Sequence, residues 1–127
     1  MIAQVGWGGL LAVAIGAVLG AWSRLALGLA LNKMLPDLPL GTLAANLAGG
    51  LMIGAAVAWL GRHPELSPVY RLFFVTGFLG ALTTFSTFSA ESLELLQRGE
   101  FGWALGHSVV HLAGCLAAAA IGFRLAS

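Results

Sequence analysis

Charged side chains are missing from four long stretches of the sequence, which are filled with apolar, glycine and small polar residues. The stretches are residues 1–23, 38–61, 72–90 and 101–123. A helix needs about 20 residues to cross the hydrocarbon core of a bilayer, so each stretch is long enough for one crossing. The pattern predicts an all-α membrane protein with four transmembrane helices, at about residues 7–31, 41–60, 69–96 and 101–125.

Composition agrees with a membrane location. Of the 127 residues, 59% are hydrophobic and only 9% are charged, and the mean hydropathy is +0.94. A soluble domain of this size would carry more charge on its surface. The connections between the spans are short, so we expect residues 1–127 to form a single four-helix transmembrane domain. The net charge is only +1 and the sequence has no basic run, so we expect no nucleic-acid partner.

Basic residues are divided equally between the two ends of the predicted bundle. They are Arg62, Arg71 and Arg124 at the end with both termini, and Arg24, Lys33 and Arg98 at the other. An excess of Lys and Arg on one side normally fixes the orientation of a membrane protein. Either this rule fails here, or the chain inserts both ways and pairs antiparallel. Four short helices are also too few to enclose a polar path, which favours an oligomer.

Glycine pairs with helical spacing occur in three of the predicted spans. The pairs are Gly16 and Gly20, Gly50 and Gly54, and Gly102 and Gly106. Two glycines four residues apart leave one helix face without side chains, so neighbouring helix backbones can approach closely in lipid. We therefore expect a tightly packed bundle with these faces at helix contacts.

The third span is apolar enough for the membrane but is a poor helix former. Residues 76–91 read Thr-Gly-Phe-Leu-Gly-Ala-Leu-Thr-Thr-Phe-Ser-Thr-Phe-Ser-Ala-Glu. Hydroxyl side chains compete with the backbone for hydrogen bonds. We expect this helix to be interrupted in mid-membrane, around Gly80–Thr83, and a broken backbone at that depth is tolerated only inside protein or beside a polar cavity. The alternative is a straight helix whose hydroxyls bond to the preceding turn.

Two segments of the chain resemble the signatures of the Fluc (CrcB-type) fluoride channels. They are residues 76–91, quoted above, and residues 41–50, Gly-Thr-Leu-Ala-Ala-Asn-Leu-Ala-Gly-Gly. Residues 16–24, Gly-Ala-Val-Leu-Gly-Ala-Trp-Ser-Arg, are similar to the family's first-helix pattern. The length, the four spans and the balanced charge agree with this resemblance, which covers the whole chain.

The resemblance implies a passive channel, not an enzyme, that lets cytoplasmic fluoride leave the cell, in the inner membrane of a bacterium. Such a channel needs no ATP site, and the sequence has no glycine-rich phosphate loop. Members of the family are antiparallel, dual-topology homodimers with two separate fluoride pathways. By position, Phe85 and Phe88 match the family's paired phenylalanines and Asn46 its pore asparagine. A structural sodium ion at the dimer centre would be held by the backbone carbonyls of Gly80 and Thr83 from each subunit.

These residue types suit the transport of fluoride, a small and strongly hydrated anion whose water must be replaced by hydrogen-bond donors. Donors are available from the Asn46 amide and from the hydroxyls of Thr42, Thr84, Ser86 and Thr87. Phenylalanine rings are electropositive at their edges, so the paired rings can present edges to an anion. Without the resemblance, these phenylalanines would be read as ordinary packing residues.

Two charged residues are candidates for the mouth of the pathway. Arg24 either places its charge at the membrane boundary or forms a positive vestibule that concentrates anions. Glu91 matches a family position near the pathway mouth.

The fourth span departs from the family pattern. His107, His111 and Cys115 recur every four residues and share one helix face, where the family usually has hydroxyl side chains. The histidines are expected to line the fluoride track or to bond between helices, and imidazole can be protonated near neutral pH, so pH dependence stays open. The spacing also suits a transition metal, but the sequence shows no partnering carboxylate or second cysteine.

A small dual-topology, proton-coupled exporter of drugs or cations is the alternative function. Such a transporter needs a carboxylate inside the membrane. The first span has none, and Glu91 and Glu94 lie towards the end of the third span. The sequence therefore favours the channel.

Overall fold

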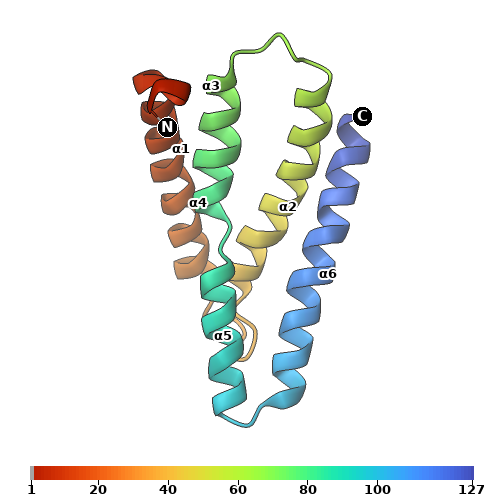
Figure 1. Cartoon of the computed structure of the whole chain (residues 1–127). Helices are drawn as coiled ribbons and strands as arrows, with labels where there is room; N and C mark the ends of the chain where they lie inside the picture. Colours follow the sequence, from red (N-terminus) through yellow and green to blue (C-terminus); the bar gives the residue numbers. More distant parts are fainter. Residues whose placement is uncertain (1) are drawn as a thin grey trace.

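The computed structural model describes residues 2–127 as a bundle of helices with short connections (Figure 1). Four helical segments are long and apolar enough to cross a membrane, as the sequence predicts. Three of them are the helices α1 (Ile2–Leu31), α2 (Leu40–Gly61) and α6 (Phe101–Ala126). The other crosses as a series of shorter pieces between Pro68 and Gln97.

The two chain ends and the loop after α2 lie at one end of the bundle, and the other two loops lie at the opposite end (Figure 1). At the first end, the Arg62 guanidinium donates to the backbone carbonyl of Ala126. At the opposite end, Arg98 forms an ion pair with Asp37 at 3.1 Å, which joins the two loops there. This arrangement agrees with an even number of crossings.

The third span contains α3 (Pro68–Arg71), the π-helical segment η1 (Leu72–Leu79), α4 (Gly80–Leu82) and α5 (Phe85–Gln97). Between α4 and α5, Thr83 (φ −83°, ψ 153°) and Thr84 (φ −150°, ψ 113°) are extended. The predicted interruption is therefore confirmed. It begins at the last residue of the predicted stretch, because Gly80–Leu82 still form one helical turn.

Glycine-lined faces produce most of the close helix contacts. Side chains added at Gly16 and Gly20 would collide with the backbone of η1, and one added at Gly50 would lie 2.9 Å from the Cys115 carbonyl of α6. These two pairs pack as predicted. The third pair makes no such contact within the described chain, because nothing lies within 4 Å of a side chain placed at Gly102 or Gly106.

Within this bundle, α1 packs along η1 and α4, while α2 packs along α6. A small apolar core of Ala45, Leu79 and Leu82 joins α2 to the third span directly above the break. The helix α5 then continues on the other side of the break and contacts α6. The break is thus positioned beside both α2 and α6, and the polar residues of the chain gather there.

Candidate functional site

Asn46 of α2 stabilises the break by forming hydrogen bonds with the backbone of Thr84. The Thr84 N–H donates to Asn46 Oδ1 at 2.7 Å, and Asn46 Nδ2 donates to the Thr84 carbonyl at 3.1 Å. This pair of bonds determines which side-chain atom is oxygen and which is nitrogen, because an amide N–H needs an acceptor and a carbonyl needs a donor. The extended conformation at Thr84 is therefore stabilised from another helix.

Hydroxyl groups beside the break begin the next helix. The Thr84 hydroxyl oxygen accepts from the Thr87 N–H at 3.1 Å, which makes Thr84 the N-cap of α5. The Thr84 hydroxyl also lies 2.9 Å from the Thr87 hydroxyl and 3.3 Å from that of Ser86. Three of the predicted fluoride-pathway residues therefore form one hydroxyl cluster at the N-terminus of a helix, where backbone N–H groups also point outward.

The break also frees backbone carbonyls. In a continuous helix the Thr84 N–H would donate to Gly80 and the Thr87 N–H to Thr83, but Asn46 and the Thr84 hydroxyl accept these two bonds instead. The carbonyls of Gly80 and Thr83 thereby lose their usual helical donors. The carbonyl of Ala81, between them in the sequence, accepts from Arg24 Nε at 3.0 Å.

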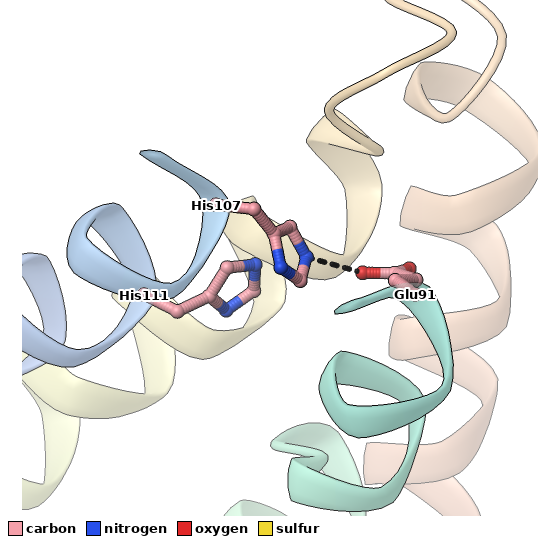
Figure 2. A group of neighbouring side chains, drawn as sticks. All are labelled: Glu91, His107 and His111. Atoms are coloured by element: carbon pink, nitrogen blue, oxygen red, sulfur yellow. Dashed lines mark hydrogen bonds and ion pairs between the residues drawn. The ribbon is translucent and has the colours of Figure 1, made fainter. Parts of the chain in front are cut away.

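A second polar cluster joins α5 to α6 (Figure 2). Glu91 Oε1 lies 3.0 Å from His107 Nε2, and Glu91 Oε2 accepts from the Thr42 hydroxyl at 2.7 Å. His107 is fully buried, and the Glu91 side chain is 13% exposed. The expectation that no carboxylate partners the histidines is therefore wrong. Glu91 lies beside them, although a different helix carries it.

His111 lies next to His107, with ring centroids 4.6 Å apart (Figure 2). Its Nδ1 atom is 3.1 Å from Asn46 Nδ2, so this atom accepts from the amide that the Thr84 backbone has already oriented. Its Nε2 atom is buried and has no hydrogen-bond partner within the part of the chain that the structure describes. A buried nitrogen without a partner is costly, and it is the only such side-chain atom found in residues 2–127.

The two phenylalanines have different environments. Phe88 is buried, and its ring stacks on His107 with centroids 5.0 Å apart and planes 9° apart. Phe85 is 70% exposed in the single chain and touches the Phe88 ring, with centroids 5.2 Å apart. One ring is therefore part of the α5–α6 packing, and the other is free to meet something outside the chain.

Two hollows meet at the break. The larger has a volume of about 620 Å³ and is lined by residues of α2, the third span and α6, among them Asn46, Gly80, Thr83, Thr84, Phe85, Phe88, His111 and Cys115. The smaller has a volume of about 430 Å³ and is lined by Arg24, Asn32, Thr42, Thr84, Thr87 and residues of α1. Thr84 lines both hollows. The predicted pathway residues are thus brought together around one point, although Ser86, Glu91 and His107 line neither hollow.

Comparison with known proteins agrees with the resemblance seen in the sequence. A family model described as "CrcB-like protein, Camphor Resistance (CrcB)" matches residues 11–123. The chain belongs to the CrcB family. A CrcB relative from Aromatoleum aromaticum is 60% identical over 89% of this chain and 86% of its own length, and one from Pseudomonas syringae pv. maculicola is 54% identical over 89% of both. Both relatives bear the name "Fluoride-specific ion channel FluC".

Membership of the CrcB family and four membrane-crossing segments identify a multi-pass membrane protein. The relatives come from bacteria and are named as ion channels, in agreement with the expectation of a bacterial protein that is not an enzyme. The family match covers α2, the break and α6 as far as residue 123, so it includes both polar clusters.

Two residues of the polar clusters escaped the sequence interpretation. Asn32 caps α2, because its Oδ1 accepts from the N–H groups of Gly41 at 2.8 Å and Thr42 at 3.2 Å. Ser92 holds the other nitrogen of His107, with Oγ 2.8 Å from Nδ1. No local motif indicates Asn32, since residues 33–39 separate it from the helix that it caps.

The Glu91–His107 contact did leave a signal in the sequence. The two residues lie eight positions before and eight after Gly99, which has a positive φ of 75° in the turn between α5 and α6. Equal distances from a tight turn place two residues at the same height on antiparallel helices. This signal could have paired the carboxylate with the histidine.

Proposed function

We propose that two copies of this chain, inserted in opposite orientations, form a passive fluoride-selective channel with two anion pathways that lets cytoplasmic fluoride out. The observation that carries this proposal is the break at Thr83–Thr84, which places Asn46, His111 and the aromatic pair beside one hollow. The names of the bacterial relatives support fluoride as the substrate.

The anion would exchange its water for donors arranged around the break. The proposed pathway comprises Thr42, Asn46, Thr84, Phe85, Ser86, Thr87, Phe88, His107 and His111, with Arg24 and Glu91 near its mouth. Hydroxyl, amide and imidazole N–H groups all donate to a small anion. Arg24 lines the smaller hollow while its Nε bonds to the Ala81 carbonyl, so it has other N–H groups left for an anion.

Pairing with a second copy is supported by what the single chain exposes. The Phe85 side chain and Gly80 are exposed beside the break, and both residues line the larger hollow. Backbone groups that face lipid without partners cost several kcal/mol each, about the cost of moving an amide from water to an alkane. Because the basic residues are equally divided, an upside-down partner is compatible with the orientation rules.

The carbonyls of Gly80 and Thr83 fit a structural sodium ion between the two copies. Both residues line the larger hollow. The N–H groups of Thr84 and Thr87, which would donate to these carbonyls in a continuous helix, donate to side chains instead. A bound sodium ion would supply positive charge to these oxygens and join one subunit to the other. We propose Gly80 and Thr83 of each copy as its ligands.

Export needs no energy source other than the membrane potential. A negative interior drives an anion outward with about 2.3 kcal/mol per charge for every 100 mV. A passive pathway is therefore sufficient for the proposed task.

Fluoride efflux from liposomes tests the proposal. Purified protein in vesicles loaded with potassium fluoride should release fluoride to an ion-selective electrode when valinomycin lets potassium follow, with no proton gradient. Phe85→Ile and Asn46→Asp should slow this release. Phe123→Ile is the matched control, because Phe123 is an exposed ring of α6 that lines neither hollow. Release that does not exceed that of empty vesicles would overturn the proposed function.

Orientation is tested separately with a reporter cysteine. In a Cys115→Ser background, Glu65→Cys places one thiol in the loop after α2, outside the helices. A reagent that cannot cross membranes should label about half of these thiols from outside intact cells if the chain inserts both ways. Labelling of all or none would rule out the antiparallel dimer.

A proton-coupled exporter gains some support from the structure. The Glu91 carboxylate is more enclosed than its place near the end of a span suggested, with a side chain 13% exposed and His107 beside it. The two functions differ in their driving force. Fluoride release without a proton gradient supports the channel, and uptake of a cationic dye that requires such a gradient supports the exporter.

A further inference from the structure

We propose that Glu91, His107 and His111 form a binding site for a divalent transition-metal ion, with Zn²⁺ as the ion that fits best. One ligand atom from each of the three residues lies within 4.8 Å of the other two (Figure 2). Two imidazoles and one carboxylate are an established ligand set for zinc. The site differs from the sodium site proposed above in its residues, its ligand chemistry and its place in the chain.

The spacing of the ligand atoms requires only a small adjustment. Ligand atoms about 2.0–2.1 Å from a tetrahedral zinc ion lie roughly 3.3 Å from one another. Glu91 Oε1 and His107 Nε2 are already 3.0 Å apart. An ion placed between them would replace their hydrogen bond, and the His111 ring would need to move by up to about 1.5 Å, from the 4.8 Å limit to roughly 3.3 Å, to complete the set.

Two of the three ligands already have an outer partner that suits a metal-bound side chain. Thr42 donates to Glu91 Oε2, and the Ser92 hydroxyl lies 2.8 Å from His107 Nδ1. Metal sites usually hold their histidines and carboxylates in this way, through the atom that does not face the metal. The Asn46 amide instead donates to His111 Nδ1. Glu91 Oε1, His107 Nε2 and the unpartnered His111 Nε2 are therefore the atoms available to a metal ion.

The unpartnered nitrogen of His111 is the second, independent observation. His111 is 3% exposed, and its Nε2 atom has no hydrogen-bond partner within residues 2–127. A packing role alone leaves this buried polar atom unexplained, whereas a metal ion would satisfy it. Binding requires the ring proton on Nδ1, where it meets the Asn46 amide, so the metal and the Asn46 hydrogen bond compete for His111.

Occupancy of the site should slow the fluoride flux. This part rests on the proposed function, because His111 lines the hollow in which we place the pathway. Three protein ligands leave one position of a tetrahedral ion open. A permeating fluoride ion or a water molecule would take that position and be held there by the charge of the metal.

Metal binding is measured first, without any transport assay. The protein is purified with a tag that contains no histidine, in a His63→Gln background that removes the histidine of the exposed loop, and is titrated calorimetrically with Zn²⁺. We expect one Zn²⁺ per chain. Glu91→Gln, His107→Asn and His111→Asn should each raise the dissociation constant more than about 100-fold, because loss of an outer partner alone costs about 10- to 100-fold.

Cys115→Ser is the matched control, since Cys115 lies one turn beyond His111 on the same helix. It should leave Zn²⁺ binding unchanged if Glu91 is the third ligand. Loss of binding in Cys115→Ser with full binding in Glu91→Gln would overturn the assignment in favour of the linear spacing along α6. The absence of Zn²⁺ binding to the parent protein would overturn the proposal altogether.

Asn46→Asp tests the competition for His111. An aspartate can still accept from the Thr84 N–H with one oxygen, and its other oxygen can accept the proton that a metal-bound His111 carries on Nδ1. We expect Zn²⁺ to bind this variant about 10-fold more tightly. Unchanged or weaker binding would contradict Nε2 of His111 as the ligand atom.

Flux measurements then separate this proposal from the proposed function. Zn²⁺ should slow fluoride efflux several-fold in the parent protein and in Cys115→Ser, each compared with its own rate without Zn²⁺. In His111→Asn the efflux rate, whatever its starting value, should be the same with and without Zn²⁺. Zn²⁺ binding in a protein that never conducts fluoride would refute only the channel. Fluoride efflux from a protein that binds no Zn²⁺ would refute only the metal site, and Zn²⁺ binding without slower efflux would refute its effect on the pathway.

Discussion

Replacing Asn46 with alanine should destabilise the protein more than removing an asparagine that caps a helix from a loop. The Asn46 amide bonds to the N–H and the carbonyl of Thr84 and to His111 Nδ1. Thr84 is 8% exposed, so water cannot take over its N–H easily. An unsatisfied buried N–H costs about 1–3 kcal/mol, and each of the other two contacts is worth about 0.6 kcal/mol inside a membrane. We expect a total loss of about 2–4 kcal/mol.

Asn32→Ala is the matched control for Asn46→Ala. Asn32 also accepts two backbone N–H bonds, from Gly41 and Thr42, but in the loop before α2. Loss of such a cap costs about 0.5–2 kcal/mol, because water can replace the side chain there. The free energy of unfolding is measured for both variants by titrating mixed micelles with a denaturing detergent.

The reasoning is refuted if Asn46→Ala costs no more than Asn32→Ala. That result would mean that the break can close into a continuous helix, in which the Thr84 N–H turns to the Gly80 carbonyl and needs no partner on α2. Slow exchange of the Thr84 amide hydrogen in the variant would identify this rearrangement. In that case the break would not depend on Asn46.

Further substitutions test the packing and the backbone by the same unfolding titration. Gly54→Val should cost about 1–3 kcal/mol because its side chain would collide with the α6 backbone, whereas Gly102→Val should cost much less, since nothing lies within 4 Å there. Phe88→Ala should cost about 3–5 kcal/mol, because Phe88 is buried. Phe85→Ala should cost less when the protein is diluted to single chains, because the Phe85 side chain is 70% exposed in the single chain. Gly6→Ala should cost about 1–3 kcal/mol, because φ is 74° and ψ 166° at Gly6, a conformation that only glycine adopts readily.

The transmembrane spans could be predicted from the sequence because bilayer thickness leaves little choice of helix length. In the structure, each span begins and ends within a few residues of its predicted bounds, except that α1 starts at Ile2 instead of residue 7. The break was also predicted, since two glycines precede five hydroxyl residues there. Its placement after Leu82 was not, because the decisive bonds come from Asn46, which lies 38 residues earlier.

The contacts between different helices are the part of the site that the sequence could not predict. The spacing of His107 and His111 showed that they share a face, but a helical period does not indicate what that face meets. Glu91 reaches them from α5. The same limit applies to Gly102 and Gly106. Their spacing predicts a helix face without side chains, but it does not indicate whether another helix of the same chain covers that face.

The residues that maintain the fold at the break are the same residues that we assign to transport. Asn46 fixes the backbone of Thr84, and Thr84 in turn starts α5 with its hydroxyl. A variant that stops fluoride efflux at either position therefore does not identify an anion ligand, since loss of the break would stop efflux too. Phe85 escapes this ambiguity, because its exposed ring supports no helix contact that the break requires. Slower efflux in Phe85→Ile with unchanged unfolding would thus be the strongest sign that the anion passes along this face.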